Sequence, residues 1–250
     1  MKSMMLKFKA GFLILFLSAG FAVAQSEEWA FEVTPYLWAG GLTGEVEIAG
    51  QKTEFEKSAS DLFDDLEFAG SFFAQAKKGR FLLQGRYDYY ALSPSGYEVD
   101  GQSVDADFDS DILIGKVAAG YQYGEPGGVT TGLLLGIQSL RIENTISGPG
   151  YSNSESDDLF DLVLIVQPVF PLWSKDETSV LFALPMSIGG AVAGDSDLYY
   201  DVEAQLQYAF TEGFDFRLGY RVSQYEWEEN SNNKLELGLA GWTFGAGFKW

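Results

Sequence analysis

The sequence predicts an all-β protein: a transmembrane antiparallel β-barrel whose strands run up and down in sequence order. Apolar and polar residues alternate over long stretches, and the chain contains 20 Phe, 13 Tyr, 6 Trp and 29 Gly. After the first 24 residues, no segment offers the roughly 18 uninterrupted apolar residues of a transmembrane helix. Because every backbone amide in lipid needs a partner, a closed barrel is the spanning form that remains.

The first 24 residues have the three parts of a secretory signal peptide. Three lysines precede an apolar run over residues 11–17, and a small-x-small site ends at Ala24. The run is close to the ~7–15 residues of a signal peptide rather than the ~20 of a membrane anchor. We predict cleavage after Ala24, which leaves residues 25–250 as one barrel domain. Removing the lysines changes the formal charge from −20 to −23, so the mature chain is expected to repel nucleic acid.

The clearest strand pattern covers residues 198–210. Leu206 and Tyr208 lie on its apolar face, whereas Glu203 and Gln205 lie on its polar face. Residues 214–222 repeat the pattern after a link of three residues, which predicts a hairpin. One face is expected to contact lipid and the other to face the lumen.

Ten segments of this kind predict a barrel of ten strands. They cover residues 29–39, 68–76, 81–91, 108–123, 129–142, 159–170, 179–190, 198–210, 214–222 and 235–250. Short links alternate with longer polar links, as in barrels with periplasmic turns and outer loops. Residues 44–55 and 96–108 each have the pattern of a hairpin, which we interpret as strands extended beyond the membrane. If those hairpins belong to the wall, the barrel has twelve strands; if two weak strands are wrong, it has eight.

Charged and polar side chains on the inward faces form the candidate functional site. Its charged members are Arg86, Asp88, Lys116, Glu203, Asp215, Arg217 and Arg221, and the same faces carry Glu32, Gln75, Gln84, Gln138, Asp161, Gln205 and Gln207. In one interpretation the arginines neutralise the carboxylates and the side chains fill the lumen, as they do in barrels of about eight strands. In the other, Arg86, Arg217 and Arg221 line a narrow channel for small solutes or ions.

The chain has no cysteine and no histidine. Disulfides and thiolate metal sites are therefore absent, and so is the imidazole that usually serves as a general base near neutral pH. An enzyme would need a carboxylate pair or a lysine-activated serine, and no local spacing indicates either. We expect a protein that is not an enzyme and has no tightly bound cofactor.

Acidic residues cluster in the predicted outer loops, most clearly at Asp105, Asp107, Asp109 and Asp111. An EF-hand that began at Asp105 would need glycine at its sixth position and glutamate at its twelfth, and the sequence has neither. Two interpretations remain: a solvated rim of like charge, or loosely bound calcium or magnesium shared with lipopolysaccharide phosphates.

Many aromatic residues lie towards the ends of the predicted strands. They include Trp29, Tyr36, Trp38, Tyr87, Tyr89, Tyr121, Tyr123, Tyr199, Tyr200, Tyr208, Phe210, Tyr220, Trp242 and Trp250. A girdle at the two membrane interfaces explains these residues. A platform for a sugar or an apolar ligand would use the same residue types.

The last strand ends on an aromatic residue, with Phe248 and Trp250 on one face. This ending resembles the C-terminal signal that the outer-membrane assembly machinery recognises. Residues 34–45 and 60–67 resemble a family of uncharacterised outer-membrane β-barrel proteins of the porin-like or opacity-like type. The resemblance implies a location in the outer membrane of a Gram-negative bacterium, with membrane lipid and lipopolysaccharide as partners. That family has no agreed activity, so the resemblance assigns no functional residue.

Two functions are consistent with these features. The first is a structural or surface-interaction role through acidic extracellular loops, with a lumen largely filled by charged and polar side chains. The second is a narrow porin-like channel lined by the three lumenal arginines. The sequence does not predict an oligomeric state.

Overall fold

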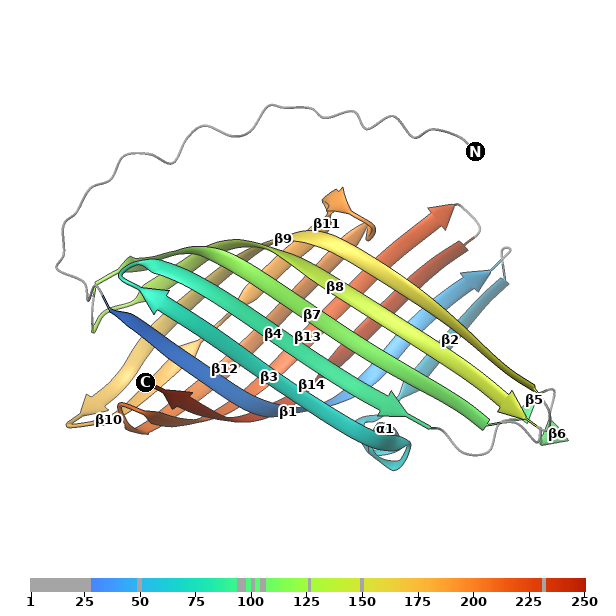
Figure 1. The fold of residues 1–250 in the computed structure, drawn as a ribbon, viewed down its shortest axis with the longest axis horizontal. Coiled ribbons are helices and arrows are strands. Elements are labelled where there is room, and N and C mark those ends of the chain that lie inside the picture. The colour runs from blue at the N-terminus through green and yellow to red at the C-terminus, as the bar shows by residue number, and fades with distance from the viewer. Residues whose placement is uncertain are drawn as a thin grey trace.

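The computed structural model describes residues 28–48, 51–93, 98–99, 102–103, 107–125, 127–148, 151–230 and 233–250. Almost all of them lie in antiparallel strands (Figure 1). The strands are β1 (Trp29–Ile48), β2 (Gln51–Lys57), β3 (Leu66–Lys78), β4 (Phe81–Leu92), β5 (Glu98–Val99), β6 (Gln102–Ser103), β7 (Asp107–Gly124), β8 (Thr130–Gly148), β9 (Tyr151–Lys175), β10 (Thr178–Ala183), β11 (Met186–Gly194), β12 (Leu198–Thr211), β13 (Phe214–Asn230) and β14 (Asn233–Lys249). The predicted signal peptide falls outside the described residues and stays a prediction.

The strands close into a barrel, which confirms the predicted fold class. Each wall strand pairs with its neighbours in sequence order, and β1 pairs with β14 from Glu32↔Lys249 to Glu47↔Lys234. The join between β1 and β14 leaves the sheet without a free edge along most of its length, as a strand structure in lipid requires.

The described residues form fourteen strand segments, more than the ten that the sequence predicts. Two causes account for the difference. The hairpins β1–β2 and β5–β6 add segments outside the ring of wall strands. In addition, one wall strand is divided into β10 and β11, because it is interrupted at Pro185 and proline has no N–H to donate. Both pieces pair with β9 and β12 without a shift of register across the break, so the ring itself has ten positions.

The two ends of the barrel differ. Tight turns after β3, β9 and β12 lie at the same end as Trp29 and Trp250, here called the turn end (Figure 1). Gly79 and Asp176 have positive φ there, 58° and 54°, as tight turns often require. At the opposite end, the loop end, strands continue well beyond a membrane: β9 has 25 residues, against about 9–11 for a spanning strand. The strand extension expected at residues 44–55 is present in β1 and β2, whereas the one expected at residues 96–108 falls largely outside the described residues.

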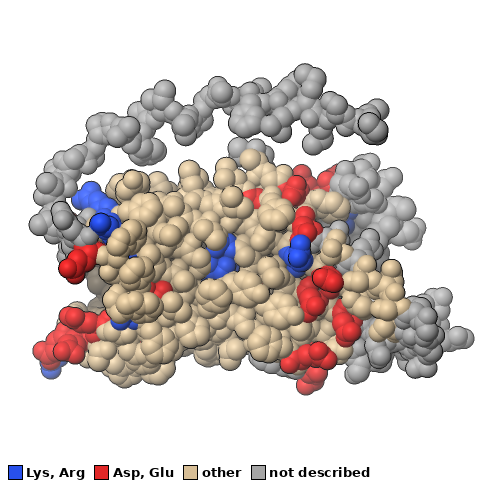
Figure 2. Space-filling view, in the orientation of Figure 1, with Lys and Arg blue, Asp and Glu red and all other residues tan. Residues whose placement is uncertain are grey.

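Large apolar side chains are exposed on strands all round the wall and form an apolar belt, and on the face seen in Figure 2 most charged side chains lie towards the two ends. Outward residues such as Val117, Ile137 and Leu164 are exposed, although their inward neighbours on the same strands are buried. This alternation matches a wall with lipid on one side and a filled lumen on the other. No helix in the described part of the chain is long and apolar enough to cross a membrane.

The inside of the barrel has an apolar layer near the loop end in addition to the predicted charges. Ile112, Leu140, Tyr199, Tyr225 and Leu239 belong to one buried cluster there. They lie on the inward faces of their strands, which on β7, β12 and β13 also carry the charged residues nearer the turn end. The lumen is therefore mainly apolar towards the loop end, whereas towards the turn end its charged and polar side chains lie beside a smaller apolar group of Leu82, Ala118 and Leu134.

One short helix, α1 (Ala59–Asp64), joins β2 to β3 at the loop end. Ser58 and Asp61 form a reciprocal cap: the Asp61 carboxylate accepts from the Ser58 N–H at 3.1 Å, and the Asp61 N–H donates to Ser58 Oγ at 3.2 Å. The hydrogen bonds from Ser58 lower the pKa of the exposed Asp61 carboxyl. The S-x-x-D spacing is the sequence signal that could have predicted this helix.

Candidate functional site in the barrel lumen

The seven charged residues that the sequence assigns to the lumen all lie there. Asp88, Lys116, Glu203, Asp215, Arg217 and Arg221 are buried, and the Arg86 side chain is 15% exposed. They come from β4, β7, β12 and β13. Alternate side chains of a strand point to the same face, so these residues all point inward. The side chains form two clusters, one around Arg221 and one around Arg217.

Arg221 is at the centre of the first cluster and is fully buried. Its Nη1 donates to Asp88 Oδ2 at 2.8 Å, and its Nε donates to Asp201 Oδ2, also at 2.8 Å. The Tyr36 hydroxyl donates to the other oxygen of Asp88 at 2.5 Å. The guanidinium carbon of Arg221 lies 4.0 Å from the centre of the Trp38 ring, a cation–π contact. A buried arginine of this kind needs both carboxylates, because burial of an uncompensated charge is costly.

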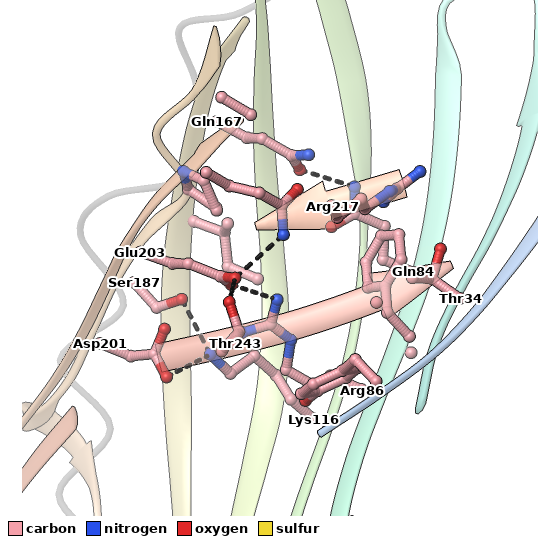
Figure 3. Close-up of a pocket in the computed structure, with 18 of the residues that line it drawn as sticks. Thr34, Gln84, Arg86, Lys116, Gln167, Ser187, Asp201, Glu203, Arg217 and Thr243 are labelled. Atoms are coloured by element: carbon pink, nitrogen blue, oxygen red, sulfur yellow. Dashed lines mark hydrogen bonds and ion pairs between the residues drawn. The ribbon is translucent and has the colours of Figure 1, made fainter. Parts of the chain in front are cut away.

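Glu203 and Lys116 complete the first cluster (Figure 3). Glu203 accepts from Arg86 Nη2 at 2.7 Å, from the Thr243 hydroxyl at 2.7 Å and from Gln205 Nε2 at 2.9 Å. Lys116 donates to Ser187 Oγ at 2.9 Å and lies 3.9 Å from Asp201. Both carboxylate oxygens of Glu203 therefore have donors, which holds this side chain across the lumen.

The second cluster lies nearer the turn end. Arg217 donates through Nε to Asp215 at 2.7 Å, and its Nη2 lies 2.6 Å from Glu32 on β1. Lys249 on β14 adds a further ion pair to Asp215 at 2.5 Å. These contacts connect β13 to β14 and to β1, across the seam where the barrel closes.

The charges in both clusters balance. The first contains three cations, Arg86, Lys116 and Arg221, and three anions, Asp88, Asp201 and Glu203. In the second, Arg217 and Lys249 balance Glu32 and Asp215. Each cluster therefore sums to zero, and neither presents an excess charge that would select ions by sign.

A small polar cavity of about 60 Å³ lies between the clusters (Figure 3). Gln84, Arg86, Gln167, Glu203 and Arg217 are among the residues that line it. A buried water needs roughly 10–15 Å³ of such space. The cavity therefore has room for a few waters and does not have the volume of an aqueous pore.

Comparison with known proteins identifies the fold. No protein-family model matches the chain, and no curated protein matches it either. Among solved structures, the outer membrane protease OmpT from Escherichia coli matches with a TM-score of 0.50, over 92% of this chain and 99% of that chain. The fold is that of an outer-membrane β-barrel. Together with the apolar belt, it locates the chain in the bacterial outer membrane.

Further matches are to other outer-membrane barrels. Ail, the attachment invasion locus protein of Yersinia pestis in complex with a heparin analogue, matches with a TM-score of 0.39 at 14% identity, over 89% of this chain and 99% of that one. The Pseudomonas putida toluene transporter TodX matches with a TM-score of 0.33 at 8% identity, over 92% and 90% of the two chains. The identity to OmpT is 9%. At these identities the likeness is one of fold alone.

The predicted cation-binding residues of this outer-membrane barrel are only partly described. Asp105 and the side chain of Asp107 lie outside the described residues. Asp109 accepts from the Ser93 hydroxyl at 2.7 Å, and Asp111 accepts from the Tyr89 hydroxyl at 2.8 Å. Within the described part of the chain, no three acidic side chains come together to hold a metal ion. Loose cation binding at this loop stays a prediction.

The predicted assembly signal lies at the closing seam. Phe248 faces outward and packs against Phe214, with ring centres 5.3 Å apart. The backbone of Trp250 exchanges hydrogen bonds with Phe31, at 2.9 and 3.1 Å. The terminal residue therefore helps to join the last strand to the first, whereas its recognition by assembly machinery stays a prediction.

Several functional residues were missed or misassigned by sequence reasoning. Asp201 was left out of the candidate site although it contacts both Arg221 and Lys116. Its position two residues before Glu203 is the signal that could have found it. The prediction of an interfacial girdle was wrong for Tyr36, Trp38 and Tyr199, which point into the lumen. On β1, Tyr36 and Trp38 lie on the same face of the strand as Glu32, so the alternation of side chains predicts that they point into the lumen.

Proposed function

We propose that this barrel has a structural or surface-interaction role at its loop end and that its lumen is closed to ions and solutes. The observation that carries the proposal is the fully paired charged layer around Arg221. A permeating ion would have to separate charges that stabilise one another in a desolvated interior, where such separation is costly. The apolar layer at the loop end adds a second barrier along the same path.

The proposed closed state predicts an electrically silent protein. We expect the refolded chain without its signal peptide to give no stable conductance steps in a planar bilayer, although heat-modified gel mobility shows that it is folded. Arg217→Ala should lower the denaturant concentration needed for unfolding and stay silent, because it removes the ion pairs to Glu32 and Asp215 and leaves the first cluster and the apolar layer in place.

The second candidate function, a narrow channel lined by Arg86, Arg217 and Arg221, makes the opposite prediction. The polar cavity favours it, since Arg86 and Arg217 both line that space. Reproducible conductance steps in the wild-type protein, with an ion preference that changes in Arg217→Ala, would overturn the closed-lumen proposal. Matched recordings of Arg141→Ala, which alters a pair on the outside of the barrel, control for surface charge.

We also propose that the chain is not an enzyme. OmpT is a protease, but the likeness to it is one of fold. In this chain the buried carboxylates of the lumen are held by arginine, lysine or hydroxyl donors. That arrangement, together with the absence of histidine and cysteine, supports a structural role for the lumenal charges.

In this proposal, the loop end is the functional surface of the protein. Carboxylates face outward there on neighbouring strands, and several stand directly opposite one another. Asp111 pairs in register with Glu143, and Glu236 pairs with both Glu45 and Glu226. Like charges that stand opposite across a sheet are destabilising. A divalent cation shared with lipopolysaccharide phosphates would relieve that repulsion and attach the loop end to the membrane surface.

This role predicts a calcium response at one end of the barrel. We expect calcium to raise the melting temperature of the protein in bilayers that contain lipopolysaccharide, and a chelator to reverse the shift. The double variant Asp109→Asn with Asp111→Asn should show a smaller shift, because it removes two outward carboxylates. Glu177→Gln, an exposed carboxylate at the turn end, is the matched control and should respond like the wild type. Equal calcium shifts in both variants would contradict the assignment to this loop.

A further inference from the structure

The barrel wall has an opening between β1 and β3. The ladder between these strands runs from Trp29↔Lys78 to Tyr36↔Ser71 and stops there. Beyond that point β1 follows β14 and β2, while β3 stays paired with β4 (Figure 1). The backbone edges at residues 37–41 and 66–70 therefore face one another without a ladder between them. In a bilayer such edges need a cover, because lipid tails offer them no hydrogen bonds.

A cavity of about 270 Å³ lies in this opening. Its outward residues, Leu37 and Phe68, are 56% and 59% exposed on the lipid-facing surface. Its inner wall is made by Trp38, Tyr90, Leu92, Ile112 and Leu239, part of the apolar layer of the lumen. The cavity therefore connects the lipid-facing surface of the wall sideways to the apolar interior.

The position of the cavity fits the boundary between the apolar belt and the polar loop end. Ala59 and Leu62 of α1 line it on the loop side together with Glu67, whereas Leu37 and Phe68 line it on the belt side. A membrane lipid has its ester oxygens at this boundary and its acyl chains below it. An engineered apolar cavity of about 150 Å³ already holds benzene, so the larger space here accommodates a segment of an acyl chain.

Two side chains of the cavity wall, Trp38 and Tyr90, each have a buried polar atom without a hydrogen-bond partner among the described residues. Trp38 is 6% exposed, and its indole Nε1 has no hydrogen-bond partner among the residues that the structure describes. Indole is a donor only, so the missing partner is an acceptor oxygen. An unpaired buried donor is uncommon in native proteins and destabilising. The lining carries no lysine or arginine, which favours a neutral ester or hydroxyl oxygen over a charged group.

We propose that this cavity binds an acyl chain of a membrane lipid, which enters sideways from the bilayer between Leu37 and Phe68. The chain lies against the apolar layer, and a neutral oxygen of the lipid accepts a hydrogen bond from Trp38 Nε1. The acyl chain offers the unpaired edges of β1 and β3 no hydrogen bond; only the oxygens of the lipid can accept from their free N–H groups. This site adjoins the charged cluster around Arg221 through Trp38 and does not require a conducting pore.

Native mass spectrometry of the refolded protein tests the proposal. The signal-free chain is folded in phosphatidylcholine vesicles, extracted into a mild detergent and weighed with its retained lipid. We expect one phospholipid per barrel for the wild type. Ala69→Phe fills the cavity from β3 and should abolish retention. Ala204→Phe, the same substitution on the exposed outer face of β12, is the matched control and should retain the lipid.

A second variant separates binding from folding. Trp38→Phe keeps an aromatic ring beside Arg221 but removes the Nε1–H donor together with part of the ring, so we expect at least roughly three- to tenfold weaker retention, the effect of one hydrogen bond. If Ala69→Phe does not fold, the comparison between the wild type and Trp38→Phe tests the proposal. Equal retention in wild type, Ala69→Phe and Trp38→Phe would overturn the site. If an added free fatty acid binds while no phospholipid is retained, the proposal that the ligand is a membrane phospholipid is overturned.

Discussion

Replacing Arg221 with methionine is expected to lower the free energy of unfolding by about 3–5 kcal/mol, the cost of removing one partner from a buried ion pair. Arg221 is fully buried and pairs with both Asp88 and Asp201. Methionine keeps much of the side-chain volume but leaves Asp88 without its cation and Asp201 with only Lys116, 3.9 Å away. The Trp38 ring also loses the guanidinium that lies 4.0 Å from its centre. This loss should be the largest of any single charge change in the barrel.

Urea unfolding in lipid vesicles, followed by tryptophan fluorescence and by heat-modified gel mobility, measures the effect. The matched control is Arg141→Met, because Arg141 pairs with Asp158 on the outside, where both side chains are exposed. We expect it to change stability by less than about 1 kcal/mol. Adding Asp88→Asn to Arg221→Met should recover part of the loss, since the cluster is then neutral again, with Arg86 paired to Glu203 and Lys116 to Asp201. Equal unfolding midpoints for Arg221→Met and Arg141→Met would contradict the assigned role.

Alternation along the strands was sufficient to predict most of the lumen. The period of two placed Glu203 and Arg221 on inward faces, and they lie there because a pleated strand has no other choice. The predicted neutralisation of Asp88, Glu203 and Asp215 by three arginines also matches the observed pairs. Parity therefore carries information about which side chains meet, provided that the fold is a closed barrel.

The sequence prediction failed where side chains were assigned by residue type instead of by their position in the alternating pattern. Trp38 and Tyr199 were assigned to an interfacial girdle because they are aromatic, although their inward neighbours shared their parity. Contacts across the lumen could not be predicted either. The pair between Arg221 and Asp88 joins β13 to β4, and these strands are not neighbours in the wall. Such a contact depends on the diameter of the closed barrel, which local sequence does not encode.

The opening between β1 and β3 could not be predicted for a related reason. The alternating patterns of these strands give no sign of where their ladder ends, and that point depends on how β1 twists away to follow β14 and β2. Gly40 and Gly41 lie on β1 just after the last paired residue, Tyr36. A Cβ at Gly40 would lie 3.1 Å from the Ala240 carbonyl oxygen of β14, and one at Gly41 would lie 3.0 Å from the Lys57 carbonyl oxygen of β2, so both glycines lie at close backbone contacts.

Replacing Gly241 with alanine is expected to prevent normal closure of the barrel. Gly241 on β14 stands opposite Gly40 on β1, at the seam where the last strand meets the first. A Cβ at position 241 would lie 2.0 Å from the carbonyl oxygen of Ala39 and 2.2 Å from the Cα of Gly40. Overpacking against side chains costs about 1–3 kcal/mol. Here the obstructing atoms belong to the backbone and cannot rotate away, so the two strands would have to separate.

The expected result is a destabilisation of at least about 3 kcal/mol, or the loss of the folded, heat-modifiable form on gels after refolding into vesicles. Gly85→Ala is the matched control, because the nearest atom to a Cβ at that position is the Lys116 carbonyl oxygen at 3.9 Å. It should fold with the yield and stability of the wild type. Both substitutions add one methyl group to a wall strand, so a difference between them isolates the close contact at the seam. If Gly241→Ala folds as well as Gly85→Ala, β1 and β14 do not approach as closely as the register of the seam requires.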